Sequence, residues 1–216
     1  MGERVAQFPA RSADRVRPRP QRLGDLAANP VSALELEQVQ SVYLRPLRYA
    51  AAQDVLRSHG LLILHGKAGT GKRAAALSLL AGLSFASAEG VAVHELNPSQ
   101  RLVDLDPAAL PANAALLLED AGGEALEGMS RYQFDSLQAH LGSEGRRCAL
   151  AVVVERLPAG FPAESRPLLL DWALEWAEDA AEAKRQMLAA HVRWYSRFEG
   201  DYVHVLQPKL ETLSAQ

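Results

Sequence analysis

The fold that we expect for this chain follows from one stretch, Gly66-Lys67-Ala68-Gly69-Thr70-Gly71-Lys72-Arg73. It matches the phosphate-binding pattern G-x-x-x-x-G-K-[ST], the P-loop, at every fixed position except the last. The glycines let the backbone turn so that consecutive N–H groups face one phosphate, and Lys72 would place its charge between the β- and γ-phosphates. All eight residues are therefore predicted to bind the phosphates of a nucleotide.

The residues on either side of this loop support the same interpretation. A short apolar run of the buried-strand type, Leu61-Leu62-Ile63-Leu64-His65, precedes it, and a run of helix-forming residues, 74–81, follows it. Strand, glycine loop and helix is the order that the motif requires. The alternative, a flexible Gly-Lys turn without a ligand, is disfavoured by these flanks.

The last position of the motif departs from the pattern, because Arg73 stands where Ser or Thr is expected. The hydroxyl of that residue normally coordinates Mg²⁺, and a guanidinium cannot coordinate a cation. Two consequences are open. Arg73 reaches a phosphate oxygen and partly replaces the metal, which favours binding over hydrolysis, or it points to solvent while an acidic residue and waters hold Mg²⁺.

A second apolar run, 114–118, ends in two acidic residues, Glu119 and Asp120. Opposite a P-loop, such a strand end supplies one carboxylate to anchor Mg²⁺ and a second to orient the attacking water. Adjacent residues of a strand point to opposite faces, so the pattern leaves open which of the two faces the metal. Both are predicted as metal and catalytic residues.

The most β-branched run of the chain, 147–154, is predicted to be a central strand. Its end carries Arg156, which we take as a candidate sensor of the γ-phosphate; an ordinary surface arginine is the alternative. The single cysteine, Cys148, lies in this run and is expected to be a small buried residue.

Other segments complete an alternating pattern of strands and helices. Strands are expected at 90–96 and 167–174, and helices at 31–40, 46–58, 130–141 and from about 179 onward. This alternation predicts βαβ units and a parallel sheet, hence an α/β fold. Tyr43 and Pro46, just before the P-loop strand, are candidate contacts for the base, with ordinary packing as the alternative.

Composition and charge suit one α/β domain with short tails. The chain has 216 residues, 48% of them apolar, and its formal net charge of −3 argues against general nucleic-acid binding. Residues 1–30 are rich in Arg and Pro and are predicted to form a disordered arm, which could alternatively contact RNA or an acidic partner. Residues 31–199 form the predicted nucleotide-binding domain, and 200–216 a tail. Without a membrane span or signal core, a cytoplasmic protein with no membrane partner is expected.

Taken together, these elements resemble the nucleotide-binding module of STAND NTPases, AAA+-related proteins, and most closely the bacterial novel STAND group. The resemblance covers roughly residues 43–195 and includes a late helix that reads Ala183-Lys184-Arg185-Gln186-Met187-Leu188-Ala189-Ala190-His191. It implies a three-layer αβα P-loop NTPase fold with a mostly parallel sheet of about five strands. It also implies ATP as ligand, Mg²⁺ handled by Glu119 or Asp120, phosphate sensing by Arg156, and protein partners or effector and sensor regions in signalling or defence.

Three departures from that family shape the expected function. Arg73 replaces the metal-binding hydroxyl, Glu119 precedes Asp120 where the usual order places Asp first, and no lid or winged-helix region follows before Gln216. We therefore expect an ATP-binding switch core with weak or no hydrolysis, at most a slow ATPase, whose other parts come from a partner. A non-catalytic nucleotide-binding interaction or regulatory protein is the alternative, and a nucleic-acid-associated AAA+ loader is a further one.

Overall fold

One sheet of six strands organises the part of the chain that the computed structural model describes, residues 28–83, 92–107, 110, 113–142, 148–161, 169–172 and 180–197. The strands are β1 (Ala28–Pro30), β2 (Leu61–His65), β3 (Val93–Leu96), β4 (Ala115–Asp120), β5 (Ala149–Val154) and β6 (Leu169–Asp171). They lie in the order β1-β3-β4-β5-β2-β6, with β1 antiparallel to β3 and every other neighbouring pair parallel. The predicted α/β fold with a mostly parallel sheet is confirmed.

Strand β5 occupies the centre of this sheet, between the P-loop strand β2 and the acidic strand β4. Val152 of β5 pairs with Ile63 on one side and with Leu118 on the other. All six residues of β5 are buried, as its continuous apolar sequence predicts for a central parallel strand. Because these strands are parallel, their carboxyl ends lie at one edge of the sheet, and that edge carries the loop after β2.

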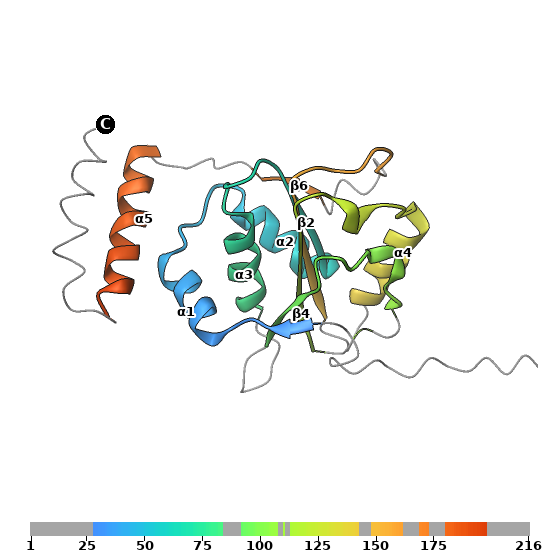
Figure 1. The fold of residues 1–216 in the computed structure, drawn as a ribbon, viewed down its shortest axis with the longest axis horizontal. Helices are drawn as coiled ribbons and strands as arrows, with labels where there is room; N and C mark the ends of the chain where they lie inside the picture. The colour runs from blue at the N-terminus through green and yellow to red at the C-terminus, as the bar shows by residue number, and fades with distance from the viewer. Residues whose placement is uncertain are drawn as a thin grey trace, which may run out of the picture.

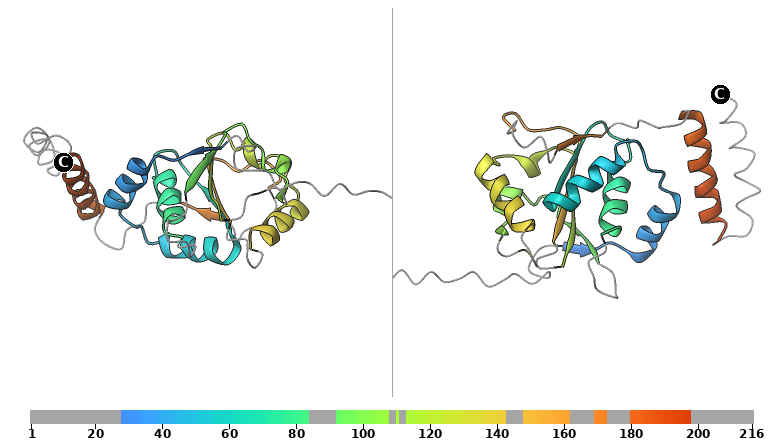
Figure 2. Two further views of the ribbon diagram at one scale, coloured as in Figure 1. Left: turned by 90° about the horizontal axis from the view of Figure 1, so that it is seen from below. Right: turned by 180° about the vertical axis from the view of Figure 1, so that it is seen from behind.

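Helices cover both faces of the sheet, as the pleat of the strands requires. Leu61 and Ile63 of β2 face one core together with α4 (Arg131–Leu141), whereas Leu62 and Leu64 face a second core with α2 (Tyr49–His59) and α3 (Lys72–Ala81). Figure 2 shows α4 on one side of the sheet and α2 with α3 on the other. Burying a leucine of this kind stabilises the fold by about 1.5–3 kcal/mol. The predicted three-layer αβα arrangement is confirmed.

Two further helices extend the layer on the α3 side. Helix α1 (Ala33–Val42) contacts α3, and α5 (Ala180–Tyr195) contacts α1 (Figure 1). Gln38 Nε2 donates a hydrogen bond to the Tyr195 hydroxyl at 3.1 Å, and Arg197 lies 3.4 Å from a carboxylate oxygen of Glu37. Helix α1 is therefore placed between the helix of the P-loop and α5.

Local sequence signals set most helix boundaries. Ser32 caps α1 by accepting a hydrogen bond from the Glu35 N–H, and Ser130 begins α4 with a capping box to Gln133. Gly60 ends α2 with a φ of 67°, a conformation that favours glycine. The expected helices at 31–40, 46–58 and 130–141 are thus present with shifted ends, and two short 3₁₀ turns, Leu102–Asp104 and Glu124–Leu126, complete the connections.

The start of the chain differs from the prediction at one point. Residues 28–30 were expected to belong to the disordered arm, but they pair with β3 as the edge strand β1, with Asn29 opposite Glu95. Residues 1–27 and the tail 200–216 lie outside the described residues, as does part of each predicted strand at 90–96 and 167–174. Within the described part of the chain, every helix falls short of the length and apolarity needed to cross a bilayer.

Candidate functional site

The loop between β2 and α3 has the backbone that its glycines predict. Gly66, Gly69 and Gly71 have positive φ angles of 142°, 74° and 74°, a region that a side chain rarely adopts. Gly71 precedes α3 without any side-chain cap, so the N–H groups of the first turn are available to an anion at the positive end of the helix. The Thr70 hydroxyl donates to the carbonyl of Lys67 at 3.0 Å and closes the turn.

Lys72 is buried at the start of α3, with only 6% of its surface exposed. Its Nζ donates hydrogen bonds to the carbonyls of Gly66, at 2.8 Å, and Lys67, at 2.6 Å. Burial lowers the pKa of Lys72, while the charges of Glu155 and Glu119 oppose this effect. The ammonium group is therefore hydrogen-bonded to the backbone of the phosphate loop. An entering phosphate would offer it stronger, charged acceptors.

Trp172, directly after β6, holds this loop in place. Its backbone N–H donates to the carbonyl of His65 at 2.7 Å, and its indole Nε1 donates to the carbonyl of Thr70 at 3.1 Å. A Cβ atom added to Gly66 would lie 2.8 Å from the carbonyl oxygen of Trp172, so this approach requires glycine. Sequence reasoning assigned Trp172 to a strand without a role, because nothing local shows that β6 lies beside β2.

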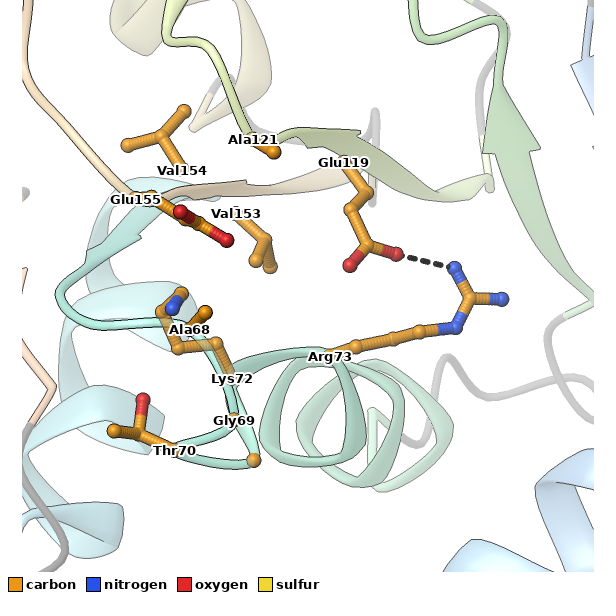
Figure 3. A pocket seen from close by; sticks show the side chains of 11 residues that line it. Ala68, Gly69, Thr70, Lys72, Arg73, Glu119, Ala121, Val153, Val154 and Glu155 are labelled. Carbon is orange, nitrogen blue, oxygen red and sulfur yellow. Dashed lines mark hydrogen bonds and ion pairs between the residues drawn. The ribbon is translucent and has the colours of Figure 1, made fainter.

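A cavity of about 200 Å³ opens above the loop (Figure 3). It is lined by residues 68–73, by Glu119 and Ala121 from the end of β4, and by residues 153–155 from the end of β5. Its volume is below the roughly 300–1,000 Å³ of pockets that enclose a whole small molecule. The cavity thus suits a phosphate tail, with the remainder of a nucleotide outside it.

Arg73 extends from α3 away from the loop and meets three glutamates. Its Nη1 lies 2.7 Å from both Glu95 Oε1 and Glu119 Oε2, and its Nη2 lies 2.8 Å from Glu95 Oε2. Its Nε and Nη2 also donate to Glu35 Oε1, at 3.3 and 3.1 Å. The five N–H donors of a guanidinium are thereby all used by carboxylates. Arg73 thus lines the cavity while its guanidinium pairs with carboxylates, an arrangement that differs from both alternatives derived from the sequence.

We refer to Arg73, Glu35, Glu95 and Glu119 as the Arg73 cluster. Its members come from α3, α1, β3 and β4, and the side chains are each between 30% and 38% exposed. The hydrogen bond to Glu95 is the main reason that the pKa of Arg73 is raised, and the same bond lowers the pKa of Glu95. Sequence reasoning gave Glu35 no role, since only the sheet order and the docking of α1 bring it to this arginine.

The acidic pair at the end of β4, Glu119 and Asp120, points to opposite faces of the strand. Glu119 lines the cavity, whereas the carboxylate of Asp120 accepts hydrogen bonds from the N–H groups of Gly122, at 2.9 Å, and Ala125, at 2.6 Å. Asp120 therefore closes the turn that follows β4 and lies outside the lining of the cavity. Its predicted metal and catalytic roles gain no support from this placement.

At the end of β5 the cavity is lined by Glu155, and Arg156 is exposed and outside the lining. The sequence predicts phosphate sensing by Arg156, whereas its exposed placement fits the alternative, a surface arginine. Both residues lie in the bend that follows β5, beyond the regular alternation of the strand, so their directions are set by the course of the chain there. Glu155 is the acidic residue that sequence reasoning missed, although it directly follows the predicted central strand.

Tyr43 is partly buried against the core. Its ring lies 6.0 Å from that of Tyr49, between centroids, and it contacts the core on the α2 and α3 side of the sheet. Burial raises the pKa of Tyr43, and its buried hydroxyl has no hydrogen-bond partner among the described residues. This supports ordinary packing over the predicted base contact.

The residues at this site do not form a magnesium site of the usual kind. Arg73 offers no oxygen, Glu119 is paired with that arginine, and Asp120 is held by two backbone N–H groups. The chemistry of these donors therefore does not fit the predicted Mg²⁺.

Comparisons with known proteins leave the family open. No family model and no curated protein matches the chain. A structure of C. elegans PCH-2 is 13% identical, with 79% of this chain and 54% of that one covered and a TM-score of 0.42. A chain of the E. coli MS115-1 HORMA:CdnC:Trip13 complex is 18% identical, with 73% and 64% covered and a TM-score of 0.36. The chain spans less than two thirds of the length of either protein.

Proposed function

We propose that this chain is a nucleotide-binding P-loop module that takes ATP and hydrolyses it slowly, if at all. The observation that carries the proposal is the loop itself. Three glycines with positive φ, an uncapped helix start and the buried Lys72 converge beside a cavity of about 200 Å³. Such a combination of free N–H groups, helix dipole and desolvated ammonium favours an anion with several phosphate oxygens.

The contacts of Lys72 explain how a phosphate would be held. Its Nζ now bonds two neutral carbonyls of the loop, at 2.8 and 2.6 Å. Hydrogen bonds to charged acceptors contribute about 1.5–3 kcal/mol each, against about 1 kcal/mol for neutral ones. A phosphate oxygen that entered the loop would therefore compete well for this ammonium group.

Slow turnover follows from the engagement of the acidic residues. Hydrolysis needs a carboxylate that orients water and a cation that neutralises the leaving phosphates. Glu119 is 2.7 Å from Arg73, and Asp120 is bound to the turn after it. Neither of these two carboxylates is available for that chemistry in this arrangement, and Arg73 offers no hydroxyl for a cation, so binding is favoured over catalysis even though Glu155 also lines the cavity.

Isothermal titration calorimetry with ATP, in EDTA and in Mg²⁺, tests the binding proposal. We expect a dissociation constant below millimolar for the natural protein in at least one condition. Lys72→Ala should weaken it by at least about tenfold, because that change removes a charge-assisted contact. Lys184→Ala, on α5, is the matched control for loss of a lysine. Absence of binding in both conditions would show that the proposal is wrong.

A second candidate is a non-catalytic interaction or regulatory protein that uses bound nucleotide as structural support. The paired state of Glu119 favours it. Turnover separates the two functions, because such a protein should consume no more ATP than the Lys72→Ala variant does. Loss of ATP clearly above that background would exclude the second candidate and establish an ATPase.

We extend the proposal to a switch role, as in the STAND and AAA+ modules that the sequence resembles. Helix α1 touches Arg73 of the P-loop helix through Glu35 and touches α5 through Gln38 and Tyr195. These contacts would give nucleotide binding a physical route to α5, the surface where we would look for a protein partner. Hydrogen exchange with and without ATP tests this. Unchanged exchange in α1 and α5 on ATP binding would rule out the switch but not the binding.

A further inference from the structure

The Arg73 guanidinium is held on all its donor edges by carboxylates of the same chain. Glu95 binds it through both oxygens, at 2.7 and 2.8 Å, and Glu35 and Glu119 take the remaining N–H groups. Paired contacts of this kind fix the orientation of the planar guanidinium in addition to neutralising its charge. Turning it toward a phosphate would break charge-assisted bonds to three carboxylates at once, so the arrangement favours Arg73 as the partner of these carboxylates over the predicted phosphate contact.

Glu119 is the carboxylate of the acidic pair that faces the cavity, and Arg73 is its cationic partner, as Figure 3 shows. In a P-loop with Ser or Thr at the last position, that hydroxyl and an acidic strand end share one Mg²⁺. Here the residue at the same position supplies a cation on its own side chain. The positive charge beside Glu119 is thus covalently part of the protein.

The charges that line the cavity are balanced without any added cation. Lys72 and Arg73 are positive, and Glu119 and Glu155 are negative. The remaining acids of the cluster, Glu35 and Glu95, bind the guanidinium from outside the lining of the cavity. The lining itself therefore adds no excess negative charge beside Glu119, although the Arg73 cluster as a whole, with one cation and three carboxylates, is net negative.

We infer that the Arg73 guanidinium takes the place of the divalent cation at Glu119, so that this loop binds its nucleotide as the free anion, without Mg²⁺. The inference rests on the proposed function, nucleotide binding, and specifies the form of the ligand. The loop N–H groups and Lys72 then contribute the attraction for the phosphates, and Arg73 keeps Glu119 from repelling them.

The test compares ATP affinity in EDTA with ATP affinity in excess Mg²⁺ by calorimetry, for the natural protein and for Arg73→Thr. In the natural protein, Mg²⁺ should leave the affinity unchanged or weaken it, because the ion competes for the free nucleotide. Arg73→Thr frees Glu119 and supplies the hydroxyl, so Mg²⁺ should tighten binding to it by at least about tenfold. Arg101→Thr, an exposed arginine outside the cavity, is the matched control and should behave as the natural protein does.

Each outcome has a distinct meaning. Tightening of at least about tenfold by Mg²⁺ in the natural protein would overturn the inference and leave the proposed function intact. Binding that is absent in both conditions would overturn the proposed function, and the inference with it. An Arg73→Thr protein that folds, binds ATP and still ignores Mg²⁺ would show that Arg73 is not what replaces the metal.

A double variant, Arg73→Thr with Glu95→Gln, tests the inference if Arg73→Thr alone does not fold. Removing the arginine leaves three carboxylates uncompensated, and Glu95→Gln in the same chain neutralises the one with the shortest pair of contacts. The double variant keeps Glu119 free and keeps the new hydroxyl. Circular dichroism checks its fold, and the same gain of at least about tenfold from Mg²⁺ is expected, whereas no gain would overturn the inference.

Discussion

The indole Nε1 of Trp172 donates a hydrogen bond of 3.1 Å to the carbonyl of Thr70, and this bond ties the end of β6 to the middle of the phosphate loop. The backbone N–H of the same residue bonds the carbonyl of His65, the last residue of β2. Trp172 is 1% exposed and packs into the core shared by α2 and α3. A buried, rigid side chain thus fixes the loop before any ligand arrives. This lowers the conformational-entropy cost of binding, because the loop is already ordered.

The first prediction follows from that bond. Trp172→Phe keeps an aromatic ring but removes the indole N–H, so the free energy of unfolding should fall by about 1–3 kcal/mol. ATP affinity should also fall, by about threefold to tenfold, because the loop loses its fixed conformation. Urea denaturation and calorimetry measure the two effects. Trp194→Phe, buried on α5, should change stability without changing affinity; equal losses of affinity in both variants would contradict a role for Trp172 at the loop.

The second prediction compares two glycines of the loop. Gly66 has a φ of 142°, and a Cβ there would lie 2.8 Å from the backbone oxygen of Trp172, whereas a Cβ on Gly69 meets nothing within 4 Å. Gly69→Ala should therefore cost only the backbone strain, about 1–2 kcal/mol. Gly66→Ala should cost clearly more, because β6 or the loop has to shift. Denaturant unfolding of both variants measures the two losses in the free energy of unfolding. Similar losses would show that the contact between Gly66 and Trp172 is not tight.

The third prediction separates two neighbouring residues at the end of β5. Glu155 lines the cavity, and its negative charge opposes the lowering of the pKa of Lys72 by burial. Arg156 is outside the lining. Glu155→Gln removes a negative charge near the phosphates and should tighten ATP binding in EDTA by about twofold to fivefold. Arg156→Ala should leave the affinity unchanged. If Arg156→Ala instead weakens ATP binding, the phosphate-sensing role predicted from the sequence is restored.

The fourth prediction concerns acid pH. The hydrogen bond from Arg73 lowers the pKa of Glu95 from its ordinary value of 4.5. A carboxylate whose pKa is lower in the folded state stabilises the protein fully above its unfolded pKa and loses that contribution as pH falls through the folded pKa. Near neutral pH, Glu95→Gln should thus cost about 1 kcal/mol, after allowance for partial exposure.

Urea unfolding of the natural protein and of Glu95→Gln, from neutral pH to well below 4.5, measures this difference. The gap between the two proteins should narrow as the pH falls below that value. Asp135→Asn, which removes a surface pair with Arg131, should produce a smaller gap at every pH. A gap that stays constant into acid would mean that the charge of Glu95 does not contribute to stability.

Much of the fold was predictable because its signals are local. The apolar run before Gly66 and the helix-forming run after Lys72 are each encoded within a few residues, and the structure has β2 and α3 there. Gly60 and Ser130 end and begin helices by interactions within one or two turns. The edge strand β1 is not predicted, because its sequence, Ala-Asn-Pro, is short, contains proline and shows no apolar alternation, and its residues gain their partners only from β3.

The site divides in the same way. Local sequence alone determined the phosphate loop, because glycine conformation, the start of a helix and the position of Lys72 need no distant partner. Which acid faces the cavity, and what Arg73 binds, were decided by the tertiary structure. The pleat of β4 turns Glu119 inward and Asp120 toward its own turn, and the sheet order with the docking of α1 brings Glu35 and Glu95 to Arg73. The spacing of a few residues along the chain is enough to reveal a phosphate-binding loop. The partner of each charged side chain depends on strands and helices that only long-range packing places beside it.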